Sequence, residues 1–163
     1  MENTPQNGIA SARLRLPEIY NFRLLDEKLG TSGQPIEEQF QAIRQAGFDV
    51  VINLALPTSD NAVPDEGSIV TGLGMAYVHI PVNFQKPASE HFQTFCQLMD
   101  AFEGRNVFVH CAANMRVSSF VFLYRVLRKG MEPSRAEQDL RAIWEPDEIW
   151  TQFMQKELGS GPA

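Results

Sequence analysis

The chain has 163 residues, of which 44% are hydrophobic, and its 14 basic and 20 acidic side chains give a net charge of −6. A chain of this length forms one domain and folds without disulfides or a structural metal. The acidic balance argues against nucleic-acid binding, which needs a basic face. The apolar runs are too short for a membrane span or a secretory signal. We therefore expect a single cytoplasmic domain.

The two ends of the chain have the composition of loose segments. Residues 1–16 are polar and mixed, and the sequence GSGPA at 159–163 is typical of a linker. We expect both segments to be flexible and residues 17–158 to form the domain.

Between these ends, apolar periodicity alternates between that of strands and that of helices. Short runs rich in β-branched residues predict buried strands at 49–56, 76–82 and 106–112. Helical spacing predicts helices at about 36–46, 92–102, 117–129, 134–144 and 147–158. The sequence ProAspGlu, at 64–66 and 146–148, predicts helix starts, since carboxylates favour the first turn. This alternation predicts a three-layer α/β sandwich, in which helices flank a mainly parallel central sheet.

The last predicted strand ends in the residues with the clearest chemistry. Cys111 follows the strand, and a short loop leads to Arg116 at the start of a helix. The N–H groups of such a loop, with the positive end of the helix dipole, bind anions and favour a thiolate. An arginine adds bidentate contacts to an oxyanion. These residues predict a site for nucleophilic attack on phosphorus or sulfur.

The segment HisCysAlaAlaAsnMetArgValSerSer at 110–119 resembles the signature loop of the cysteine-dependent protein tyrosine phosphatase superfamily. Segments 32–35, 47–54 and 77–82 are similar to those of its small dual-specificity-like members, so the resemblance covers about residues 20–130. Four residues separate the cysteine from the arginine, whereas the common family pattern has five. The bacterial branch called beta-lactamase-hydrolase-like phosphatases has the four-residue spacing and is the most similar.

The resemblance implies a role for each residue of the loop. Cys111 would be the nucleophile that forms a phosphocysteine, and Arg116 would clamp the phosphate. His110 would orient the loop, and a hydroxyl of Ser118 or Ser119 would stabilise the leaving thiolate. The substrate would be a phosphorylated protein or small molecule, and no cofactor is implied. The phosphate-binding loop would consist of Ala112, Ala113, Asn114, Met115, Arg116 and Val117.

Two positions depart from the family pattern. Asn114 stands where the family has a loop glycine, and asparagine is the best other residue at positive φ. Asn83 stands at the usual place of the general acid, an aspartate, and an amide cannot protonate a leaving group. We therefore expect slow turnover or a substrate with a good leaving group. Carboxylates that remain as candidate acids are Glu90, Asp60, Asp65 and Glu66.

Two other functions remain open at this stage. A rhodanese-like sulfurtransferase would use a persulfide on Cys111 in a similar nest of amides. However, the AspXxxArg of that family is replaced by IleAsnLeuAla at 52–55. Alternatively, with Asn83 at the acid position, the domain would bind phosphate without turnover, as a pseudophosphatase does.

The remaining candidates have structural explanations. Cys96 lies on an apolar helical stripe, His79 fits a hydrogen-bonded position in a strand, and His91 fits the surface of a helix. The histidines and cysteines lack metal-ligand spacing, so no metal site is predicted. GlyLeuGly at 72–74 does not predict a dinucleotide-binding site, because it precedes a strand and lacks the third glycine of that motif. Packing roles are also expected for Trp144 and Trp150.

Overall fold

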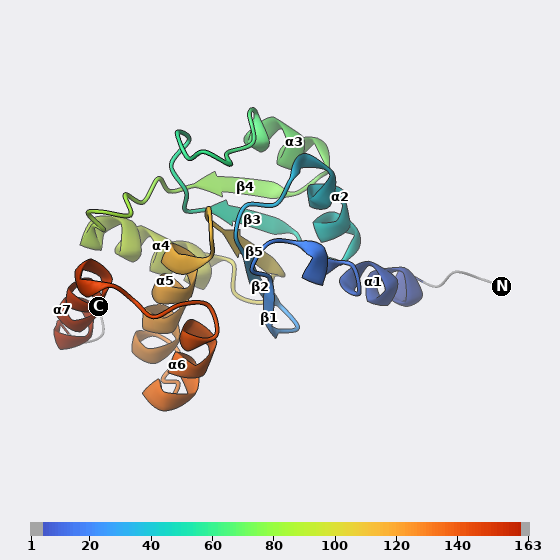
Figure 1. Ribbon diagram of the computed structural model, residues 1–163. Helices are drawn as coiled ribbons and strands as arrows, with labels where there is room; N and C mark the ends of the chain where they lie inside the picture. Colours follow the sequence, from blue (N-terminus) through green and yellow to red (C-terminus); the bar gives the residue numbers. More distant parts are fainter. Residues whose placement is uncertain (1–4, 161–163) are drawn as a thin grey trace.

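The fold is built on a five-stranded sheet with helices on both faces (Figure 1). The computed structural model describes residues 5–160. The strands are β1 Arg23–Asp26, β2 Leu29–Ser32, β3 Val50–Asn53, β4 Ala76–His79 and β5 Val107–His110. Their order is β1-β2-β5-β3-β4, in which β1 and β2 are antiparallel and the other pairs are parallel. The predicted sandwich around a mainly parallel sheet is therefore confirmed.

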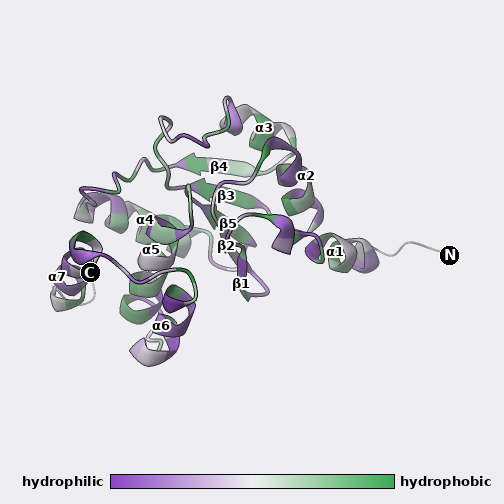
Figure 2. Ribbon diagram, in the orientation of Figure 1, coloured by the Kyte–Doolittle hydropathy of each residue, from purple (hydrophilic) through white to green (hydrophobic). Residues whose placement is uncertain are grey.

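The helices form two groups, each with its own apolar core against the sheet. The first group is α1 Pro5–Arg13, the 3-10 helix η1 Leu16–Glu18, α2 Glu37–Gln45 and α3 Glu66–Gly72. The second is α4 Ser89–Ala101, α5 Met115–Leu127, α6 Pro133–Arg141 and α7 Glu148–Gly159. Figure 2 shows the hydrophobic strands β3 and β5 and helix α5 between more hydrophilic outer segments. No helix within residues 5–160 has the length and apolar content that crossing a membrane requires.

Strand β5 lies at the centre of the sheet and is buried on both faces. Phe108 and Val109 belong to opposite cores, because successive side chains of a strand point to opposite faces. The register pairs His110 with Ser32 of β2 and with Asn53 of β3. Polar residues thus meet at the carboxyl ends of the parallel strands, where open α/β sheets bind their ligands.

The sequence pattern does not predict the hairpin of β1 and β2. Strand β1 begins with Arg23 and ends with Asp26, and Gly30 interrupts the apolar pattern of β2. A Cβ atom on Gly30 would lie 2.9 Å from the ring of Phe108, so this position accepts only glycine without displacement of the ring. Close packing against the central strand therefore determines the residue here, rather than strand propensity.

The N-terminal segment differs from its prediction as a flexible end. Residues 5–13 form α1, and Ala12 and Leu16 are buried in the first core. Arg13 donates hydrogen bonds to the carbonyl oxygens of Ala46, at 3.1 Å, and Glu27, at 2.7 Å. These few contacts hold the segment in place, although its polar composition is typical of a flexible terminus. Residues 1–4 and 161–163 lie outside the described residues, and residues 159–160 end helix α7.

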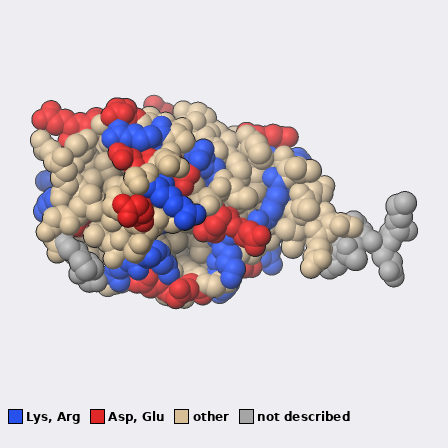
Figure 3. Space-filling model, turned by 90° about the horizontal axis from the view of Figure 1, so that it is seen from below, with Lys and Arg blue, Asp and Glu red and all other residues tan. Residues whose placement is uncertain are grey.

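Charged side chains connect the second helix group to the edge of the sheet. Figure 3 shows basic and acidic side chains interspersed over the underside of the molecule. Asp139 of α6 accepts from Arg23 of β1 and from Arg125 of α5, each at 2.7 Å. Partial burial alone would raise the pKa of Asp139, but the hydrogen bonds of the two arginines outweigh it and hold the pKa below its ordinary value.

Replacement of Asp139 by asparagine tests this connection. Asp139→Asn should lower the free energy of unfolding at neutral pH by about 1 kcal/mol, because the bridged groups remain partly exposed. A lowered folded-state pKa stabilises the protein above the ordinary value of 3.8 and ceases to do so as the pH falls through the folded-state pKa. In denaturant titrations, the difference between wild type and variant should shrink in acid. A difference that is constant with pH would contradict this account.

Candidate active site

The candidate site begins where β5 ends, at the edge formed by the carboxyl ends of the strands. Cys111 is fully buried, and its backbone N–H donates to the carbonyl oxygen of Ser32 at 3.3 Å. The chain then turns through Ala112–Asn114 and enters α5 at Met115. The structure thus confirms the predicted sequence of strand, cysteine, short loop and helix.

The loop is held from outside through two of its carbonyl groups. The oxygen of Ala112 accepts from the backbone N–H of Gln34 and from the side-chain amide of Asn61, both at 3.1 Å. The oxygen of Ala113 accepts from the side-chain amide of Asn21 at 3.0 Å. These partners come from three separate segments, before β1, after β2 and after β3. The loop conformation therefore depends on residues that are far from it in the sequence.

These contacts determine the direction of the loop N–H groups. All peptide bonds of the described residues are trans, so each C=O points away from the N–H of the next residue. The N–H groups of Ala113 and Asn114 therefore point away from the outside partners. The N–H of Ala112 has the corresponding orientation, since the Cys111 carbonyl oxygen faces Nδ1 of His110 at 3.2 Å. Backbone N–H groups at the start of a helix are the groups with which such loops bind anions.

Asn114 makes the turn into helix α5. Its φ of 66° is in the left-handed region, the conformation expected where the related proteins have glycine. Its buried side-chain amide donates to the Asn21 carbonyl oxygen at 2.8 Å and to Oγ1 of Thr31 at 3.2 Å. Asn21 also has a positive φ, of 51°. The two asparagines therefore support each other, and Asn114 does more than substitute for a glycine.

Arg116 lies almost fully buried at the start of α5. Its Nη1 donates to the Val82 carbonyl oxygen at 2.9 Å, and its Cζ lies 5.8 Å from the centre of the Phe84 ring. A guanidinium carries five N–H donors, so the contact with Val82 leaves donors for an oxyanion. Arg116 therefore joins the loop after β5 to the segment that follows β4.

Asn83 lies in that same segment, between the two residues that contact Arg116. Its side chain is exposed, and its Oδ1 accepts from the backbone N–H of Gln85 at 2.9 Å. Asn83 therefore lies in the segment that contacts Arg116, and its side chain is a neutral amide.

The candidate acids occupy different environments. Glu66 is buried and hydrogen-bonded to His110, so it is not a proton donor to substrate, and this candidate was wrong. Asp65 is the exposed residue before α3, and Glu90 lies in the exposed first turn of α4. Asp60 is exposed and adjoins Asn61, whose side chain contacts the loop. The segment of Asp60 is therefore held against the nest.

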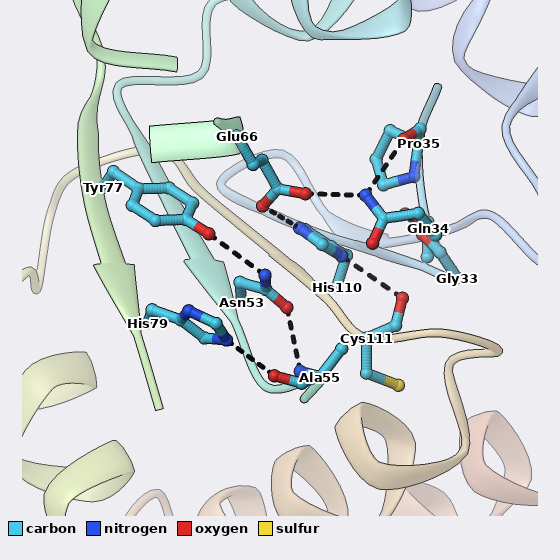
Figure 4. A network of polar contacts seen from close by, with 11 residues as sticks. Gly33, Gln34, Pro35, Asn53, Ala55, Glu66, Tyr77, His79, His110 and Cys111 are labelled. Carbon is cyan, nitrogen blue, oxygen red and sulfur yellow. Dashed lines mark hydrogen bonds and ion pairs between the residues drawn. The ribbon is translucent and has the colours of Figure 1, made fainter. Parts of the chain in front are cut away.

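A network of polar contacts lies next to Cys111 (Figure 4). Nε2 of His110 is 2.7 Å from Oε2 of Glu66, and Nε2 of Gln34 donates to Oε1 of Glu66 at 2.6 Å. Burial alone would raise the pKa of Glu66, but the hydrogen bond and charge of His110, with the Gln34 amide, hold it below the ordinary value. Local sequence patterns contain no signal for this network, because its members belong to different elements.

Two other members of the network fix the end of β3. The side-chain amide of Asn53 donates to the Tyr77 hydroxyl at 3.0 Å, and its oxygen accepts from the Ala55 N–H at 2.8 Å. Nε2 of His79 contacts the Ala55 carbonyl oxygen at 2.6 Å, which agrees with the structural role expected for this histidine.

The remaining predicted residues lie within the helices. The hydroxyls of Ser118 and Ser119 donate to the Met115 carbonyl oxygen, at 3.1 and 2.9 Å, and Val117 is buried in the core. Burial raises the pKa of Cys96 in α4 to about 12, so this residue remains a thiol in the core. Among residues 5–160, no group of three or more His, Cys, Asp and Glu side chains is arranged to hold a metal ion.

The chain and its fold are similar to those of known proteins. The model of the family described as DSP-PTPase phosphatase fused to NAD+ kinase matches residues 25–157. A crystal structure of a DUF442 protein from Shewanella putrefaciens CN-32, named as a phosphatase, has a TM-score of 0.83 and 37% identity, and covers 92% of this chain and 99% of its own.

Two more distant structures show the same fold. Tk-PTP has a TM-score of 0.68 and 20% identity, with 86% of this chain and 95% of that one covered. TpbA of P. aeruginosa, in complex with phosphotyrosine, has a TM-score of 0.65 and 15% identity, with 86% and 83% covered. No curated protein matches the chain.

Two substitutions of Asn114 separate its backbone role from its side-chain role. Asn114→Gly keeps the left-handed turn but loses the two amide hydrogen bonds. Asn114→Ala loses those bonds and also places a Cβ at positive φ, so it should be less stable than Asn114→Gly by about 1–2 kcal/mol. Denaturant titration of both variants measures the difference. Equal stabilities would show that the left-handed conformation is not retained.

Proposed function

The chain belongs to the family of DSP-PTPase phosphatases fused to NAD+ kinase, and on that premise we propose that it hydrolyses phosphate monoesters through a phosphocysteine on Cys111. The observation that carries the proposal is the orientation of the loop, in which the carbonyls of Ala112 and Ala113 are bound from outside. This orientation, at the N-terminus of α5 and next to Cys111, supports the binding of an anion there. Arg116 supplies the positive charge for the same anion.

The proposed reaction has two steps. The Cys111 sulfur attacks phosphorus, the S–P bond forms, and the bond between phosphorus and the leaving oxygen breaks. Loop N–H groups and Arg116 are positioned to stabilise the charge on the phosphoryl oxygens in the transition state. Water then attacks the phosphocysteine, the S–P bond breaks, and inorganic phosphate and the thiolate are released.

The proposed reaction needs a proton donor for the leaving oxygen. Asn83 at the acid position cannot donate this proton. A substrate whose leaving oxygen is stable without a proton, such as an aryl phosphate, should therefore react fastest. Asp60 is a remaining candidate, because its neighbour Asn61 contacts the loop. We propose that turnover is slow unless Asp60 provides this proton.

The wall beside Arg116 supports an aromatic substrate. Phe84 packs against Trp144 and Trp150, with ring centres 5.7 and 6.0 Å apart. Of the proteins with this fold, TpbA is described in complex with phosphotyrosine and PTPMT1 in complex with the phosphoinositide PI(5)P. We propose phosphorylated proteins or small molecules as substrates, with aryl esters preferred.

Replacement of the nucleophile tests the chemistry. Cys111→Ser should abolish vanadate-sensitive phosphate release from an activated aryl phosphate, because a serine hydroxyl is a far weaker nucleophile at neutral pH. Cys96→Ala, which removes the other thiol from the core, is the matched control and should retain activity. Full activity of Cys111→Ser would reject the proposal.

An inactive wild-type protein would favour one of the two other functions. Binding of vanadate without hydrolysis would indicate a phosphate-binding pseudophosphatase, which the neutral amide of Asn83 favours. Transfer of sulfur from thiosulfate to cyanide would indicate a sulfurtransferase.

Restoration of a carboxylate at position 83 tests the missing acid. In Asn83→Asp, a carboxylate oxygen can accept the Gln85 N–H as the amide oxygen does, so the local turn should persist. The rate for a substrate with a poor leaving group should rise by on the order of 10²-fold, with a new loss of activity at basic pH. Asp60→Asn should lower the rate of the wild type if Asp60 donates the proton. An unchanged rate and pH profile in Asn83→Asp would contradict this explanation of slow turnover.

A further inference from the structure

Both ring nitrogens of His110 face hydrogen-bond acceptors. Nδ1 is 3.2 Å from the Cys111 carbonyl oxygen, and Nε2 is 2.7 Å from Oε2 of Glu66. A carbonyl oxygen only accepts hydrogen bonds, so Nδ1 carries a proton. An ionised carboxylate also only accepts, so Nε2 carries a second proton wherever Glu66 is ionised. The charge of Glu66 therefore decides whether His110 is a cation.

The surroundings of Glu66 favour its ionised form. Its Oε1 accepts a hydrogen bond from Gln34, and its pKa lies below the ordinary value despite burial, which acts in the opposite direction. The hydroxyl of Tyr77, on β4, also faces this carboxylate, and burial raises the pKa of Tyr77, so that it remains neutral. Gln34 and Asn53 carry no charge.

In the pair formed by Glu66 and His110, the histidine is the member that lies next to Cys111. His110 immediately precedes Cys111 in the chain and is fully buried, as Cys111 is. The ring contacts the Cys111 carbonyl with one nitrogen and Glu66 with the other, so the cation lies between the carboxylate and the cysteine (Figure 4). The other charged group assigned to the nest is Arg116, from α5. A doubly protonated His110 would thus add a second positive charge near Cys111, while the negative charge of Glu66 is one side chain further away.

We propose that Glu66 is a positioning residue that holds His110 as a doubly protonated imidazolium beneath Cys111. The inference rests on the proposed role of Cys111 as the nucleophile and deepens it. The imidazolium favours the thiolate by its charge. It also holds the Cys111 carbonyl, and thereby directs the N–H of Ala112 toward the bound anion.

The position of Glu66 extends this role to the segment between β3 and α3. Glu66 is the first residue of α3, and Asn61 of the preceding segment binds the Ala112 carbonyl. The same segment therefore holds two consecutive peptides of the loop, one directly through Asn61 and one through Glu66 and His110.

Glu66→Gln isolates the charge from the hydrogen bonds. The new amide oxygen can accept from Gln34, and the new NH₂ can donate to Nε2 of a neutral His110 that keeps its proton on Nδ1. All contacts of the network are then retained without the cation. The pH midpoint of thiolate formation at Cys111 should rise by about one unit, since a nearby positive charge is lost.

The thiolate is measured by its ultraviolet absorbance, as the difference between each protein and its Cys111→Ser counterpart. Nitrogen NMR of His110 should show two protonated ring nitrogens in the wild type and one in Glu66→Gln. Glu66→Asp, which keeps the charge, should restore part of the midpoint shift. Glu157→Gln is the matched control, because Glu157 is an equally buried carboxylate that bonds Ser89 instead, and it should leave the midpoint unchanged.

The outcomes are distinguishable. An unmoved midpoint in a folded Glu66→Gln protein, with loss of thermal stability only, would show a structural role and overturn the inference. If Glu66→Gln does not fold, the wild-type NMR spectrum decides, and a single protonated nitrogen on His110 overturns it. These measurements need no substrate. A wild type that releases no phosphate would therefore reject the proposed function, whereas the midpoint shift would still support the charge relation.

Discussion

The loop between β5 and α5 presents its N–H groups to an anion only while its carbonyl oxygens are bound by other parts of the chain. A free carbonyl would turn toward the anion as easily as away from it and would repel it. Asn21, Gln34 and Asn61 supply neutral donors for this purpose, and His110 supplies a donor from within the strand. The sheet register places three of the segments together, since it aligns the ends of β2, β3 and β5. Residues from four parts of the chain thus determine the orientation of the three peptide groups that follow Cys111, Ala112 and Ala113.

The position of the segment after β4, residues 82–84, depends on the C-terminal helices. Arg116 holds the segment after β4 through the Val82 carbonyl, and Trp150 of α7 donates from Nε1 to the Phe84 carbonyl at 2.9 Å. The segment that carries Asn83 is therefore attached on both sides of this residue, at Val82 to Arg116 and at Phe84 to Trp150 of the core. Such attachment suits a segment that must present a group at a defined position. In this chain the residue at that position is Asn83, an exposed amide that accepts from the Gln85 N–H.

The sequence predicts the part of the site that is local in the chain, and this is the strand, the cysteine, the turn at Asn114 and the arginine. The superfamily resemblance based on these residues is confirmed by the family match. The residues that orient the loop are not predictable in this way, because Asn21 and Ala113 are 92 positions apart and Glu66 and His110 are 44 apart. Glu66 has the sequence pattern of a solvated helix start, and only the fold shows that it is buried.

The position of the two tryptophans gives the protein an optical property. Trp144 and Trp150 have ring centres 6.3 Å apart, and both pack on Phe84, whose ring lies over the guanidinium of Arg116. The chain has only these two tryptophans, so its tryptophan fluorescence originates near Arg116. An oxyanion bound to Arg116 would change the electric field at the indole rings of the two tryptophans. The tryptophan emission of the unlabelled protein should therefore respond when Arg116 binds an anion.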